Sequence, residues 1–379
     1  MRETKDIKGW VSPVAIHPGE FLKDALEDFH MTQVELSERA GLSPKVINEI
    51  INGKNPITRV TAFKLSKVFS TSEEYWVNLQ NIYDSDKARL EEKKRIEEDT
   101  QEYLPQFAET YKELSLIGIT SGKRWIKSNY PEIVLELQKF YAADSLGYVV
   151  SQTCSQIKYR KYTRDNLNLF TLAAWLRLGK IKAQKTDIPA YSESKLKEVV
   201  ETLPKLSLEG PNIYLPKLES ILNECGVVLA YLPKLKNTHV QGAATWVGKD
   251  KALIMLNASN KHEDRFWFSL LHEMGHILKH SKKEEFIDLG EREDENHEEE
   301  EADEFAQEHL VPNFKKVFEE VNSYSSFILG IQTLSKKLQI SPSILAGRIA
   351  HEFQKRGRNI YANLNGFLET RINYSNLEI

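Results

Sequence analysis

The sequence has little sulfur, no long apolar run and little net charge, and each absence excludes a class of protein. Two cysteines, Cys154 and Cys225, occur in 379 residues. They are too few for a thiolate zinc cluster, so we expect buried, reduced thiols. No segment approaches the roughly eighteen consecutive apolar residues of a membrane helix, and the first residues lack the apolar core of a secretion signal. We therefore expect a cytoplasmic protein that does not enter the membrane.

Charge and composition narrow the class further. The formal net charge is −4, which argues against a uniformly basic protein that coats nucleic acid. Hydrophobic residues make up 41% of the chain and charged residues 28%, as in a folded globular protein. A chain of 379 residues is long enough for two or three domains, each with its own core.

Residues with catalytic chemistry gather in a segment that predicts a helix and follows the apolar residues 266–271. His272 and His276 stand four positions apart, so both imidazoles share one helix face and can bind one metal ion. Zinc suits two such nitrogens together with a water molecule in an open position. Glu273 can accept a proton from that water, whose pKa the metal lowers. The competing interpretation is a chance five-residue match on an amphipathic helix.

A zinc site of this kind needs a third ligand, because two histidines leave the ion under-coordinated. Residues 297–312 predict a helix that Pro312 ends, and its inner face extends back to Glu298 and Glu299. We favour Glu299 as the third ligand and keep Glu298 as the alternative. Asp303, four positions after Glu299, can then orient a histidine ligand through a hydrogen bond. The other glutamates of this run suit a solvated helix start.

These motifs resemble the ImmA/IrrE family of zinc-dependent metallopeptidases. The resemblance rests on residues 272–276, 299–306 and 310–312, which follow the family pattern of a His-Glu-x-Gly-His helix, a Glu-x-x-Ala-(Asn/Asp)-x-Phe-Ala helix and a closing Leu-x-Pro. It implies a Zn²⁺ cofactor and a cytoplasmic endopeptidase that cleaves a helix-turn-helix repressor. The acidic segment 291–304 departs from the pattern, and it leaves the choice between the two glutamates open.

The first part of the chain predicts five short helices between residues 14 and 83. Thr32 and Ser43 are expected helix N-caps on either side of Gly41, a combination typical of two helices joined by a tight turn. The spacing of residues 33–53 resembles the phage-repressor helix-turn-helix class. With residues 17–20 before it and residues 76–80 after it, the segment resembles the HigA antitoxins. This implies binding to double-stranded operator DNA as a homodimer, because such domains read two half-sites.

The expected DNA-facing residues follow from the docking geometry of that class, in which the start of the recognition helix enters the major groove. We expect base contacts from Pro44, Lys45, Asn48 and Glu49, and phosphate contacts from Gln33, Lys54 and Arg59. Basic residues outnumber acidic ones between residues 45 and 69, as expected of a DNA face. The alternative is a helical scaffold that does not bind DNA and serves dimerisation or partner docking.

We therefore predict a multidomain, mainly α protein. Residues 1–84 form a helix-turn-helix DNA-binding domain, and residues 85–205 form a charged connector helix with a helical middle region. Residues 206–379 form an α+β zincin-like metallopeptidase domain with a small antiparallel sheet, in which residues 227–232 are a buried strand and residues 243–257 a hairpin.

The predicted function combines the two ends of the chain. We expect a DNA-binding transcriptional regulator fused to a zinc endopeptidase that cleaves a partner repressor or a toxin–antitoxin or prophage regulator. The competing hypothesis is a non-proteolytic, antitoxin-like repressor whose zinc domain is structural or sensory. Glu273 favours the enzyme, because a purely structural zinc site has no need of a proton acceptor.

Overall fold

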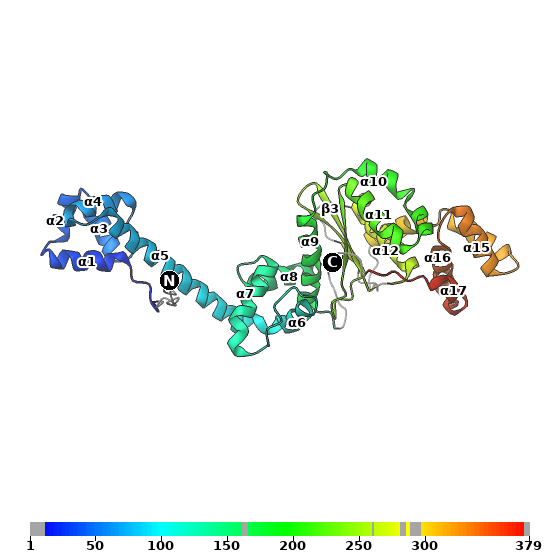
Figure 1. Cartoon of the computed structure of the whole chain (residues 1–379), viewed down its shortest axis with the longest axis horizontal. Helices are drawn as coiled ribbons and strands as arrows, with labels where there is room; N and C mark the ends of the chain where they lie inside the picture. The colour runs from blue at the N-terminus through cyan, green and yellow to red at the C-terminus, as the bar shows by residue number, and fades with distance from the viewer. Residues whose placement is uncertain (1–11, 161–165, 260, 281–285, 289–296, 375–379) are drawn as a thin grey trace, which may run out of the picture. The chain divides into compact units, whose positions relative to one another are not determined.

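The computed structural model describes the chain except residues 1–11, 161–165, 260, 281–285, 289–296 and 375–379, and it describes residues 154–160 by their backbone alone. The chain divides into two compact units. The first contains residues 1–105, 126–138 and 144–147, and the second contains residues 106–125, 139–143 and 148–379. Figure 1 shows helices throughout both units and strands in the second. Every described helix is too short or too polar to cross a lipid bilayer.

The first unit begins with the five predicted helices. They are α1 (Pro18–Asp28), α2 (Gln33–Ala40), α3 (Pro44–Ile51), α4 (Arg59–Phe69) and α5 (Glu73–Glu98). The caps are those expected, since the Thr32 side chain accepts a hydrogen bond from Glu35 N and Ser43 accepts one from Val46 N. Gly41 ends α2 with a φ of 60°, a conformation that glycine adopts without strain.

The charged segment continues α5 without a break, as predicted, and then passes into a π-helical turn at Asp99–Tyr103 and a 3₁₀ turn at Leu104–Phe107. Asp99 is buried in this turn and accepts hydrogen bonds from Gln138 Nε2 at 2.9 Å and from Leu146 N at 2.8 Å. These contacts join the connector to α7 (Tyr130–Tyr141) and to the first turn of α8 (Leu146–Arg160). A buried carboxylate needs such donors, because an unpaired charge would be costly there.

The second unit contains a four-stranded sheet surrounded by helices. Its strands are β1 (Val227–Leu232), β2 (Gly242–Val247), β3 (Lys251–Asn257) and β4 (Phe286–Asp288). Its helices are α6 (Ala108–Leu116), α9 (Leu169–Lys185), α10 (Glu193–Val200), α11 (Pro211–Glu224), α12 (Glu263–Lys279), α13 (His297–Leu310), α14 (Phe314–Ser323), α15 (Phe327–Leu338), α16 (Pro342–Lys355) and α17 (Asn365–Leu368). Short 3₁₀ turns lie at Lys127–Asn129, Leu203–Glu209 and Tyr361–Leu364, the first of them in the first unit.

The sheet is mixed, so the prediction of an antiparallel sheet was wrong for β1. The strand order is β1-β3-β2-β4, with β2 antiparallel to both neighbours and β1 parallel to β3. After β1 the chain reverses direction, and β2 lies two positions away from β1 in the sheet. β3 then lies between β1 and β2, antiparallel to β2 and parallel to β1. The predicted hairpin itself is confirmed.

Helices cover the two faces of the sheet in different ways. Met255 of β3 faces α9, where a Cβ added to Gly179 would lie 2.2 Å from the Met255 sulfur. The neighbouring residues Ile254 and Leu256 point to the opposite face, since successive strand residues alternate. There they join the core that includes Phe266 of α12. In Figure 1 α9 lies on one side of the sheet and α11 and α12 lie on the other. The Cys225 thiol is buried and free, while the Cys154 side chain lies outside the described residues.

Helices α15 and α16 repeat the turn between α2 and α3. The sequence Leu-Ser-x-x-x-x-x-Ser-Pro occurs at residues 36–44 and again at residues 334–342. Gln339 takes the left-handed conformation of Gly41, with a φ of 57°. The helix face that is exposed on α3 has its counterpart on α16 buried against α12. There a Cβ added to Gly347 would lie 2.5 Å from an Asp264 oxygen of α12. The second turn therefore supports the helix that carries His272 and His276.

Candidate metal centre

Three of the predicted ligands lie together on helices α12 and α13. His272 and His276 are 1% and 2% exposed, and their Nε2 atoms lie 3.1 Å apart. Glu299 of α13 reaches both, with Oε2 3.3 Å from His272 Nε2 and Oε1 3.5 Å from His276 Nε2. The structure thus places Glu299, rather than Glu298, against both histidines.

The spacing of these atoms suits a tetrahedral metal ion. Zinc binds nitrogen and oxygen at about 2.0–2.1 Å, so two ligand atoms of one tetrahedral site lie about 3.4 Å apart. The three measured separations of 3.1, 3.3 and 3.5 Å lie close to that value. His272, His276 and Glu299 could therefore hold one metal ion.

Close packing of α12 and α13 brings the three residues together. A Cβ added to Gly275 would lie 3.2 Å from Ala302 Cα and from a ring carbon of Phe305. A larger residue at position 275 would push the two helices apart and move Glu299 away from the histidines. The glycine between the two histidines thus has a packing role.

Neighbouring side chains orient both imidazoles. Asp303 Oδ1 lies 2.9 Å from His272 Nδ1, as the sequence predicted, and leaves Nε2 facing the site. On the other histidine, His276 Nδ1 lies 2.9 Å from His280 Nδ1, and His280 Nε2 lies 3.1 Å from Glu301 Oε2. His280 thus contacts His276 on the side opposite the candidate ligand atom Nε2 and supports its orientation.

Two further residues of the site come from β4, to which the sequence analysis assigned neither structure nor function. The Phe286 ring stacks on His276 with a centroid distance of 4.3 Å and an angle of 13°. Asp288 lies with His272 and Glu273 in a group whose ligand atoms are all within 4.8 Å of one another. Only the pairing of Gly242 with Asp288 across β2 and β4 brings this carboxylate to the site.

Glu273 is fully buried, and neither of its carboxylate oxygens has a hydrogen-bond partner among the described residues. A Cβ added to Gly242 of β2 would lie 2.3 Å from Oε1, so the glycine leaves room for the carboxylate. Burial raises the pKa of Glu273 well above its usual value, and nearby Asp288 and Glu299 add to the rise while His272 opposes it. Such an unpaired, perturbed acid is typical of a functional site.

Burial and hydrogen bonds shift the pKa values of the candidate ligand residues in the metal-free chain. Burial alone would lower the pKa of His272, but hydrogen bonds to Asp303 and Glu299 raise it to about 10. Burial would raise the pKa of Glu299, but hydrogen bonds to His272 and His276 hold it well below its usual range. Burial lowers the pKa of His276. At neutral pH, His272 and Glu299 therefore form a buried ion pair.

The predicted DNA-facing residues lie at the surface of the first unit. The exposed ones are Gln33, Pro44, Lys45, Asn48, Lys54 and Arg59. Glu49 differs, because it is partly buried and its Oε2 accepts a hydrogen bond of 2.6 Å from Asn55 Nδ2. The start of α3 thus presents Lys45 and Asn48 to solvent, while Glu49 is held by its own domain.

Two family descriptions match the chain. The IrrE N-terminal-like domain of the M78 peptidases matches residues 223–350, which include the three candidate ligands and Glu273. A helix-turn-helix domain matches residues 22–76, which include α2 and α3. The chain therefore joins a helix-turn-helix domain of the regulator type to a domain of a metallopeptidase family.

Curated relatives share only a small part of this chain. The HTH-type transcriptional regulator YbaQ of Escherichia coli is 30% identical over 103 residues, which are 26% of this chain and 91% of YbaQ. Virulence-associated protein I of Dichelobacter nodosus is 37% identical over 71 residues, which are 18% of this chain and 66% of that protein.

Solved structures give matches of similar extent. A HigA-family addiction-module antidote protein from Coxiella burnetii is 36% identical, with 22% of this chain and 92% of that chain covered and a TM-score of 0.21. The Pseudomonas aeruginosa antitoxin HigA, solved with the higBA promoter, is 32% identical, with 22% and 94% covered and a TM-score of 0.21.

Proposed function

Because the chain belongs to the helix-turn-helix transcriptional regulators and carries an IrrE N-terminal-like peptidase domain, we propose that it is a DNA-binding zinc endopeptidase of the cytoplasm. Its substrate is a partner protein, either a transcriptional repressor or a component of a toxin–antitoxin or prophage system. The observation that carries the enzyme proposal is the fully buried Glu273 carboxylate, without a hydrogen-bond partner among the described residues, beside three convergent ligand residues.

The proposed mechanism assigns one role to each residue. His272, His276 and Glu299 would hold Zn²⁺, and Asp303 and His280 would keep the two imidazoles oriented. Bound zinc supplies Lewis-acid chemistry, which lowers the pKa of water and polarises a peptide carbonyl. Glu273 accepts the proton of the attacking water and passes it to the leaving amine. The absence of a side chain at Gly242 leaves room for the Glu273 carboxylate at this position.

A non-proteolytic regulator is the second candidate, and Asp288 is the observation that favours it. Its carboxylate lies near His272 and Glu273 and would close the site if it served as a fourth ligand. To separate the two functions, the full chain is co-expressed with the products of the neighbouring genes, as wild type and as Glu273→Gln. A partner cleaved only by the wild type supports the peptidase, and cleavage of no partner by either form contradicts it.

Zinc uptake by the metal-free chain is expected to release about one proton at pH 7.5. The His272 pKa of about 10 keeps this imidazole protonated there, and zinc binding requires its Nε2 lone pair. Metal affinity should therefore rise with pH and level off above about 10. Calorimetry in two buffers of different ionisation enthalpy measures the proton count. Asp303→Asn removes one of the two hydrogen bonds that raise this pKa, so it should release fewer protons. Zinc uptake without proton release would contradict the assignment.

We propose that the helix-turn-helix domain binds operator DNA as a homodimer. Lys45 and Asn48 contact bases, and Lys54 and Arg59 contact phosphates. Asn48→Ala should weaken binding to the chain's own promoter by about 1–3 kcal/mol and reduce its sequence preference. Lys54→Ala should weaken binding to any DNA and lower the slope of log K against log salt by about one. Fluorescence anisotropy measures both effects, and Lys93→Ala on the exposed surface of α5 is the matched control. Unchanged DNA affinity of both Asn48→Ala and Lys54→Ala would contradict this mode of DNA binding.

A further inference from the structure

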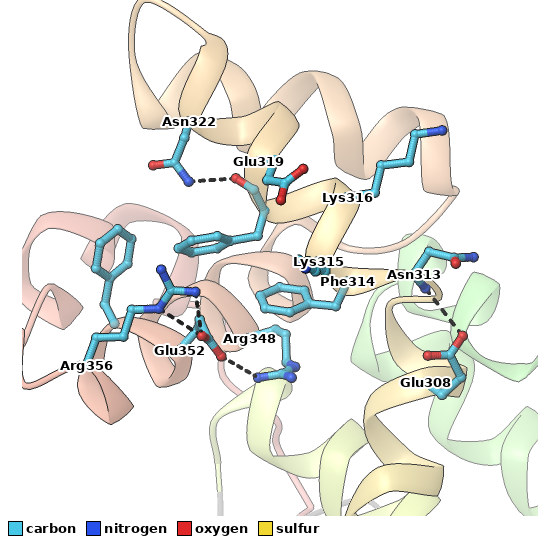
Figure 2. Close-up of a pocket in the computed structure, with 12 residues that line it drawn as sticks. Glu308, Asn313, Phe314, Lys315, Lys316, Glu319, Asn322, Arg348, Glu352 and Arg356 are labelled. Carbon is cyan, nitrogen blue, oxygen red and sulfur yellow. Dashed lines mark hydrogen bonds and ion pairs between the residues drawn. The ribbon is translucent and has the colours of Figure 1, made fainter.

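A cavity of the second unit lies away from the candidate metal centre. It has a volume of about 1170 Å³ and is lined by α14, α16 and the end of α13 (Figure 2). That volume suits a small organic ligand, since ligand sites commonly enclose a few hundred to about a thousand cubic ångströms. His272, His276, Glu273 and Glu299 are absent from its lining residues, all of which the structure describes.

Arg348 of α16 is the unusual residue of this cavity. Its side chain is only 12% exposed, and its guanidinium carbon lies 4.1 Å from the centroid of the Phe314 ring. Nη2 donates a hydrogen bond of 2.7 Å to Gln307 Oε1, which fixes the orientation of the group. Nε and Nη1 are buried and have no hydrogen-bond partner among the described residues. Two nitrogens of a positively charged group thus lack an acceptor in the described part of the chain, and both are shielded from solvent in this conformation.

The neighbouring carboxylate of Glu352 does not supply the missing hydrogen bonds of Arg348. Figure 2 shows Glu352 between Arg348 and Arg356. Its Oε1 accepts from Arg356 Nε at 2.9 Å and lies 2.8 Å from Arg356 Nη2, whereas its Oε2 is 3.9 Å from Arg348 Nη1. Glu352 therefore binds Arg356 by hydrogen bonds and Arg348 only by a longer ion pair. Arginine keeps its charge even when it is buried, so a closer anion would stabilise it.

The rest of the cavity suits an anion with an apolar part. Lys315 and Lys316 are exposed at its edge, and basic residues outnumber acidic ones by four to three among its lining residues. Phe314 and Phe318 supply aromatic surface beside the guanidinium groups of Arg348 and Arg356. Water could accept hydrogen bonds from Arg348, but it would not offset a positive charge held away from bulk solvent.

We propose that this cavity is a binding site for a small anionic ligand that carries a phosphate or carboxylate group on an aromatic or apolar body. The positive charges of Arg348 and Arg356 attract the oxyanion, and the rings of Phe314 and Phe318 contact the body. An arginine suits both oxyanions, because its guanidinium group is always charged. This ligand site is separate from the proposed peptidase centre, and the proposal does not depend on peptidase activity.

The test is calorimetric titration of the metal-free, full-length chain at constant ionic strength. Inorganic phosphate, phenyl phosphate and phenylacetate are the probes, and the last two distinguish the two oxyanions. Metal-free protein prevents binding of the probes to zinc, so the result is independent of the proposed peptidase. We expect saturable binding of phenyl phosphate or phenylacetate, and weaker binding of inorganic phosphate because it lacks the aromatic body. Saturable binding of none of the three overturns the proposal.

Variants locate the binding within the chain. Arg348→Met should weaken it at least about tenfold, since it removes a positive charge from the lining of the cavity. Lys336→Met removes a positive charge from the exposed surface of α15 outside the cavity and should leave the affinity unchanged. Lys316→Met at the edge should weaken binding roughly two- to fivefold and decides the matter if Arg348→Met does not fold. Equal affinity of the wild type and the folded variants of Arg348 or Lys316 overturns the proposal.

Discussion

Glu273→Gln is expected to lower kcat for cleavage of the partner protein by about a hundred- to ten-thousand-fold, the usual contribution of a general base. Glutamine has the shape of glutamate but cannot accept the proton of the attacking water. The loss should appear in kcat rather than in KM, because Glu273 is assigned to proton transfer and not to substrate binding.

The same substitution should leave the fold and the metal content intact. Both carboxylate oxygens of Glu273 lack a hydrogen-bond partner among the described residues, so the change removes no hydrogen bond that holds the fold together. Burial raises the pKa of this acid, which means that its ionised form is unfavourable in the folded chain. We therefore expect the free energy of unfolding to change by no more than about 1 kcal/mol.

Steady-state cleavage, zinc content and thermal unfolding of the purified variant together decide this prediction. Glu300→Gln is the matched control, since it makes the same change at an exposed position of α13. Full activity of Glu273→Gln would exclude Glu273 as the proton acceptor. A loss of zinc together with activity would instead make Glu273 a ligand. That result would favour the structural site of the non-proteolytic alternative.

Glu299→Gln is expected to weaken zinc binding by more than about a hundredfold, which exceeds the usual effect of losing a residue that only orients a ligand. Its two oxygens lie 3.3 and 3.5 Å from the Nε2 atoms of His272 and His276. Cleavage should be lost at limiting zinc and partly recovered at high zinc concentration.

Glu298→Gln provides the matched comparison, because the sequence alone left the two neighbouring glutamates as alternatives. It should bind zinc with the affinity of the wild type. Competition with a chromogenic chelator measures both variants under the same conditions. Weak binding by Glu298→Gln and normal binding by Glu299→Gln would reverse the assignment, and equal affinities in all three proteins would remove both glutamates from the site.

The sequence by itself determined those parts of the site that depend on helix geometry. Four positions bring His272 and His276 to one face of a helix, and the same spacing brings Glu299 and Asp303 to one face of the next. The caps at Thr32 and Ser43 are equally local, because each side chain binds a backbone N–H three residues later. Interactions over three or four residues can be read from residue types alone.

Only the tertiary structure decided the contacts between segments far apart in the chain. Asp288 reaches the site because β4 pairs with β2. β1 runs parallel to β3 because β3, the second strand of the hairpin, lies between β1 and β2. The Arg348 side chain is only 12% exposed because it lies against Gln307 of α13 and Phe314 of α14, although the same position of an isolated helix would be solvated. No local periodicity encodes these pairings, since they depend on how much apolar surface the whole unit buries.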